Sequence, residues 1–168
     1  MNSGSSAELR RQADQVPWDL RRWFDDRTIV RLALDAVQSL ERGIPPVPGQ
    51  DLSPRMMLTL LSYCYAVGVY GSEDIVWATR HDAAARYICA HNPPDMEAVR
   101  AFRRAARSKI AACLVRMMQQ AWALKLDAAE VDYGGYGWFE SDLNREIRDR
   151  ADVKLEVAAL MDRIGLEV

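Results

Sequence analysis

The sequence predicts an all-α protein, a compact multi-helix domain with one long helix near residues 95–126 and an amphipathic helix in the C-terminal part. Apolar residues recur at spacings of three and four along several segments, which is the period of one helix face. Proline and glycine separate these segments, because neither residue continues a helix well. No strand-like alternation of apolar and polar residues persists for more than a few residues.

The size and composition of the chain predict one soluble domain, since 168 residues with 49% apolar content are typical of a single packed core. No apolar run approaches the roughly 20 residues of a membrane helix, and the first residues lead into charged ones instead of a signal peptide. We therefore expect no membrane partner and a cytoplasmic location. Three widely spaced cysteines, Cys64, Cys89 and Cys113, lie among apolar residues and predict reduced core thiols.

The first half of the chain predicts two principal helices. Apolar spacing indicates a helix from about Asp26 to Leu40, and the proline- and glycine-containing segment 43–49 then forms a rigid linker. Ser53 can cap a helix that starts at Pro54 and runs to about Val67. This second helix is apolar on nearly all sides, so it should be the most buried element.

Three polar residues predict the starts of further helices. Ser72 is expected to cap a short helix, Asp82 another over 83–90, and Asp95 a segment without proline or glycine that extends to Leu126. The apolar stripe of this last segment predicts one long helix, or two helices joined by a slight bend. A turn over 132–138 and a final helix over about 141–164 complete the chain.

This organisation predicts three parts: a polar segment over 1–18, a helical domain over 19–126, and a turn with an acidic C-terminal helix over 127–168. Charge is distributed unevenly, with a balance of 0 over residues 1–50, +4 over 51–125 and −6 over 126–168. Any contact with nucleic acid must therefore be local to the middle of the chain.

Several motifs in the middle of the chain occur in a recognisable order. They are the stretch SPRMML from Ser53 with the Tyr, Gly and Ser positions that follow it, a Tyr-Ile and closing Asn over 84–92, and the stretch PPDMEAVRAFRRA over 93–105. Together they resemble the N-terminal (InsH-like) domain that precedes the catalytic domain of DDE-type insertion-sequence transposases. The resemblance covers roughly residues 20–120. It implies a helical module that binds duplex DNA at transposon ends.

Two departures from that family limit what the resemblance implies. The family commonly has a basic residue where Glu73 and Asp74 stand here, so no phosphate contact is expected there. The DDE nuclease also needs three carboxylates from an RNase-H-like sheet to hold two metal ions, and only Asp127 falls near an expected position. We therefore expect no catalytic residue, no metal, no cofactor and no enzymatic activity, as in a truncated transposase or a regulator of transposition.

The candidate DNA contacts are arginines. Arg100, Arg103, Arg104 and Arg107 have helical spacings that place them on and beside one face, and Arg55 belongs to the SPRMML stretch. Such a face suits phosphate contacts. The alternative is that these arginines keep a long helix soluble or pair with the acidic C-terminal segment.

Other residue types carry weaker functional signals. Trp77 and Trp122 lie in apolar helical patterns, so core packing is predicted in preference to base stacking. His81 and His91 have no partner at metal-ligand spacing and are expected at the surface.

The C-terminal helix is the basis of a second functional hypothesis. Its acidic balance and its apolar residues, among them Leu143, Ile147, Leu160 and Ile164, predict that it folds back on the basic helix or mediates self-association. A protein-interaction or homo-oligomerisation module in which DNA binding is lost thus stays open as the alternative to a DNA-binding module. An enzyme would need a site that the sequence does not indicate.

Overall fold

The computed structural model describes residues 16–40, 42–47, 49, 51–128 and 140–166, and this part of the chain contains helices and no strand. The predicted all-α class is therefore confirmed, while the predicted turn over 132–138 lies outside the described residues. The elements are η1 (Leu20–Arg22), α2 (Asp26–Gln38), α3 (Pro54–Ala66), α4 (Ser72–His81), α5 (Ala83–Ile88), α6 (Met96–Ala105), α7 (Arg107–Asp127) and α8 (Glu140–Leu166).

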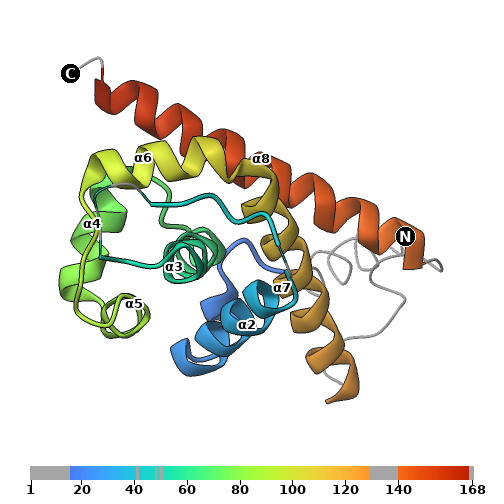
Figure 1. Cartoon of the computed structure of the whole chain (residues 1–168). Helices are drawn as coiled ribbons and strands as arrows, with labels where there is room; N and C mark the ends of the chain where they lie inside the picture. The colour runs from blue at the N-terminus through green and yellow to red at the C-terminus, as the bar shows by residue number, and fades with distance from the viewer. Residues whose placement is uncertain (1–15, 41, 48, 50, 129–139, 167–168) are drawn as a thin grey trace, which may run out of the picture.

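Helix α3 is the central element, as its composition predicts. Every residue from Met57 to Ala66 is buried, and α2, α5, α6 and α7 all pack against the helix (Figure 1). Ser53 Oγ accepts the amide of Met56 at its start. At its end Gly68 has a positive φ of +81°, and the Val69 amide donates to the Cys64 carbonyl, which is the geometry of a Schellman cap.

Side-chain caps begin several helices where the sequence predicts them, with one exception. Asp82 accepts the amide of Ala84, and Asp95 accepts that of Ala98. Ser72, however, is the first residue of α4 and not its cap, because its hydroxyl instead donates to Asp162 of α8 at 2.6 Å. The predicted cap was wrong because this hydroxyl donates to a carboxylate that is distant in the sequence.

The segment over 95–126, predicted as one long helix or as two helices joined by a slight bend, is two helices. The chain departs from helical geometry at the fully buried Ala106 (φ −101°, ψ 13°), and Figure 1 shows α6 and α7 meeting at a sharp angle. The bend lets α6 pack on α4 and α3 while α7 runs along α2, α3 and α8. A straight helix would not bring both of these apolar stripes onto the core.

Helix α8 folds back over the rest of the domain and packs along α7 (Figure 1). Its inward side chains join the core formed by the other helices, which confirms the predicted return of this helix. The buried apolar residues of α8 are Leu143, Ile147, Ala151, Leu155 and Ala158.

The three cysteines are free and buried, as predicted. Burial raises the pKa of Cys89 and of Cys113 to about 11, and it also raises the pKa of Cys64, so the thiolate form is disfavoured. Among the described helices, no stretch is both long and apolar enough to span a bilayer.

Candidate nucleic-acid interface

Arg103, one of the predicted DNA contacts, is a buried structural residue. Its Nη1 donates to the Ala158 carbonyl of α8 at 2.8 Å, and its Nη2 donates to Ser72 Oγ of α4 at 2.9 Å. Its Nε lies 3.4 Å from Oδ2 of Asp162, and its guanidinium lies 5.6 Å from the centre of the Tyr65 ring. The side chain therefore joins α6, α4 and α8 and presents little surface to a ligand.

Arg100 also faces α8. Its Nε lies 3.9 Å from Oδ1 of Asp162, the carboxylate that Arg103 contacts, and the side chain is largely covered. Its Nη2 comes within 4.0 Å of the position that a Cβ on Gly165 would occupy. Two of the four arginines thus pair with the acidic helix, which is the alternative that the charge distribution left open.

Arg104 and Arg107 remain at the surface, one on each side of the bend at Ala106. Neither forms an ion pair with a carboxylate among the described residues. Helix α7 begins at Arg107 with no side-chain cap and no acidic residue in its first turn. The positive end of its dipole is therefore not neutralised locally by a carboxylate.

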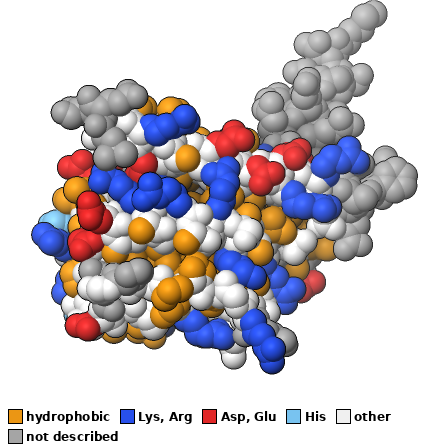
Figure 2. Space-filling model, turned by 45° about the horizontal axis from the view of Figure 1, so that its top comes forward, with side chains coloured by type: hydrophobic (Ala, Val, Ile, Leu, Met, Phe, Trp, Pro, Cys, Tyr) orange, Lys and Arg blue, Asp and Glu red, His pale blue; other side chains and the backbone are white. Residues whose placement is uncertain are grey.

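Lys109, in the first turn of α7, adds a third cation beside Arg104 and Arg107. A Cβ on Gly43, in the linker after α2, would lie 3.2 Å from Lys109 Nζ, so the lysine stem rests against this linker. Figure 2 shows Lys and Arg side chains gathered across the middle of the face that includes α6 and α8, with apolar side chains exposed between them. We call Arg104, Arg107 and Lys109 the basic corner.

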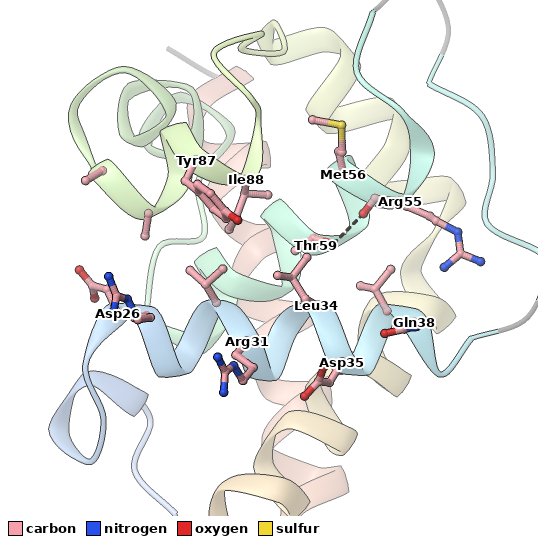
Figure 3. Close-up of a pocket in the computed structure, with 15 residues that line it drawn as sticks. Asp26, Arg31, Leu34, Asp35, Gln38, Arg55, Met56, Thr59, Tyr87 and Ile88 are labelled. Atoms are coloured by element: carbon pink, nitrogen blue, oxygen red, sulfur yellow. Dashed lines mark hydrogen bonds between the residues drawn. The ribbon is translucent and has the colours of Figure 1, made fainter.

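Arg55 lies on a different surface, a groove of about 1070 Å³ that runs between α2, the start of α3, and α5. No residue of α6 or α7 lines this groove. Leu34 and Tyr87 are exposed along it, and Figure 3 shows the Arg55 side chain directed away from both. The backbone carbonyl of Arg55 accepts a hydrogen bond from Thr59 Oγ1 at 2.7 Å. The structure thus does not bring Arg55 together with the basic corner.

Lys154 of α8 is a buried cation that the sequence interpretation missed. Its Nζ donates to the carbonyl oxygens of Trp18 and Tyr65 and to the hydroxyl of Tyr70, and it faces the Trp18 and Tyr70 rings. Burial lowers its pKa to about 8, although the carboxylate of Asp19 opposes this shift. The lysine compensates a carbonyl at the negative end of α3 and ties α8 to the N-terminal part of the domain.

A signal for Lys154 was present in the sequence. The residue lies between Ala151 and Leu155 on the inward apolar stripe of α8, at a position where helical spacing predicts burial. A charged residue at such a position is an indication of specific buried partners.

The two tryptophans predicted to be core residues differ. Trp122 is buried, whereas Trp77 is 61% exposed and stacks on His81 with 4.2 Å between ring centres. The prediction for Trp77 was wrong because α4 buries the face carrying Ile75 and Ala78, which places Trp77 on the outer side.

Within the described ranges, no group of three or more His, Cys, Asp or Glu side chains is arranged to hold a metal ion. Asp127 is exposed at the last residue of α7. Both histidines lie at the surface, as predicted.

Comparison with known proteins gives no assignment: no family model, no curated protein and no solved structure matches this chain.

Proposed function

We propose that the protein is a DNA-binding module, of the kind found at the N-terminus of insertion-sequence transposases, without catalysis of its own. The observation that carries this proposal is the pair of exposed arginines, Arg104 and Arg107, beside the uncapped start of α7. Duplex DNA, with transposon ends as the natural site, is the proposed partner.

The chemistry of the basic corner suits phosphate oxygens. Amides at a helix start point outward, and the helix dipole favours a negative group there. Guanidinium groups on both sides of the bend can donate to the same or adjacent phosphates. These contacts position a protein on the DNA backbone without reading base sequence, so affinity should exceed sequence preference.

The expected strength of binding follows from the number of free cations. Each phosphate neutralised contributes about −0.9 to the slope of log K against log salt, so Arg104 and Arg107 together should contribute about −1.8. Arg100 and Arg103 should contribute almost nothing, because Asp162 and buried acceptors already engage them. With so few contacts we expect an affinity on the order of micromolar or weaker at about 50 mM salt.

The test is fluorescence anisotropy of a labelled duplex, titrated with the full chain at several salt concentrations. Replacing both Arg104 and Arg107 by alanine should weaken binding at low salt and remove about 1.8 from the slope. The matched control replaces the exposed Arg80 and Arg86, which lie on α4 and α5, and removes the same charge. If the wild type does not bind, or if both double variants bind equally well, the proposal is wrong.

The second candidate is a module for self-association. It is favoured by one observation, an apolar stripe on α8 whose residues Val153, Leu160 and Ile164 are 43%, 48% and 50% exposed.

A further inference from the structure

Helix α8 carries two apolar stripes, and only one of them is used within the domain. The inner stripe is buried against the core, whereas Val153, Leu160 and Ile164 are 43%, 48% and 50% exposed. Val157 lies between them and is partly exposed. The residues predicted from sequence to fold back or to self-associate therefore divide between the two faces. Leu143 and Ile147 face inward, and Leu160 and Ile164 face outward.

The outer stripe has the spacing of a helix-pairing seam. Its residues follow one another at intervals of four, three and four, which is the repeat that keeps apolar side chains facing a second helix. A shallow groove of about 450 Å³ follows this stripe. Three charged residues border the groove: Glu156 and Arg163 of α8, and Arg107 of the basic corner on α7. None of them forms an ion pair with a described residue.

We propose that α8 pairs antiparallel with α8 of a second copy of this chain, so that the protein forms a two-fold symmetric dimer. With the two-fold axis between Val157 and Leu160, Val157 packs on Leu160 of the second copy. In the same register Val153 packs on Ile164 of the second copy. Four apolar layers then form from residues that are otherwise exposed to water.

The charges beside the seam favour a second copy of α8 as the partner and an antiparallel orientation of the two helices. In the antiparallel register Glu156 and Arg163 of the second copy flank the seam on the same side, offset by two residues or about 3 Å along the axis, and the two-fold axis repeats this pair. A parallel register would instead place Glu156 opposite Met161. The surface is thus complementary to itself in one orientation, which favours a second copy over an unrelated partner.

The size of the seam limits the strength of the dimer. About three helical turns of each copy take part, which is well below the roughly 800 Å² per partner of a standard stable interface. We expect a dissociation constant on the order of 10 to 100 µM.

The experiment is sedimentation equilibrium of the full chain from about 5 to about 500 µM, a range that brackets this constant. The wild type should pass from monomer to dimer across it. Leu160→Asp places a charge in the centre of the seam and should weaken association by at least about tenfold. Leu34→Asp is the matched control, because Leu34 is 45% exposed on α2 and does not line the α8 groove. Far-ultraviolet circular dichroism shows that each variant is folded.

A charge exchange tests the antiparallel register. Glu156→Arg places like charges beside each other at both pairs and should weaken the dimer by about tenfold. Adding Arg163→Glu to that variant reverses both partners and should restore wild-type association. A monomer at every concentration would overturn the proposal, as would a dimer that Leu160→Asp leaves intact or one that responds to neither charge variant. No DNA is present, so the result is independent of the proposed DNA contact.

Discussion

Arg103 and Arg104 are neighbours in the sequence with opposite structural roles, and a paired substitution can measure the difference. Arg103→Met removes two hydrogen bonds and the contact with Asp162, while the methionine retains an apolar stem in the same space. Arg104→Met removes an exposed side chain on the same helix. The two variants have the same charge and the same new side chain, so each controls for the other.

The loss of stability expected for Arg103→Met follows from the buried groups that lose their partner. The carbonyl of Ala158 loses its guanidinium donor. Among the described residues, the largely buried Asp162 keeps the Ser72 donors and the more distant Arg100. Removing one partner of a buried charge pair costs about 3 to 5 kcal/mol. An exposed substitution without specific partners changes stability by less than about 0.5 kcal/mol.

Equilibrium urea unfolding followed by circular dichroism measures both free energies of unfolding. The midpoint should fall strongly for Arg103→Met at an unchanged m-value and stay near that of the wild type for Arg104→Met. A double-mutant cycle with Asp162→Asn should give a coupling energy of about 1 to 3 kcal/mol. If Arg103→Met is as mild as Arg104→Met, the assignment of Arg103 as the link between α6 and α8 is refuted.

Two further predictions concern the middle of α8 and the end of α3. Burial lowers the pKa of Lys154 from 10.5 to about 8, so between these values the unfolded chain binds more protons and stability rises with pH. From pH 7 to 10.5 the free energy of unfolding of the wild type should gain about 3 kcal/mol relative to Lys154→Met, and parallel pH profiles would contradict this burial. In Gly68→Ala the added Cβ meets no neighbouring atom, but the alanine must adopt a positive φ, so calorimetry should show a free energy of unfolding that is lower by about 1 kcal/mol. An unchanged melting temperature would contradict the cap geometry.

Local patterns in the sequence were sufficient for most helix starts and for the element at the centre. Ser53 with Pro54, Asp82 and Asp95 begin helices where predicted, because a cap bonds to amides only two or three residues away. The all-round apolar composition of α3 predicted its burial, because a helix without a polar face has no side to present to water.

The candidate site could be predicted only in part. Helical spacing grouped Arg100, Arg103, Arg104 and Arg107, because it depends on neighbours along one helix. The bend at Ala106 and the approach of Asp162 then divided the group into two buried or covered residues and two exposed ones. Both events depend on helices that are distant in the sequence.

The sequence by itself therefore determined which residues share a helix face, where most helices begin, and that charge is concentrated in the middle and at the end of the chain. Only the tertiary structure decided which of those faces meet. Asp162 contacts Arg103 and Ser72, and Lys154 donates to a carbonyl at the end of α3, because α8 folds back along α7. The period of a helix specifies the direction of each side chain about its own axis, but the packing of the other helices specifies what lies in that direction.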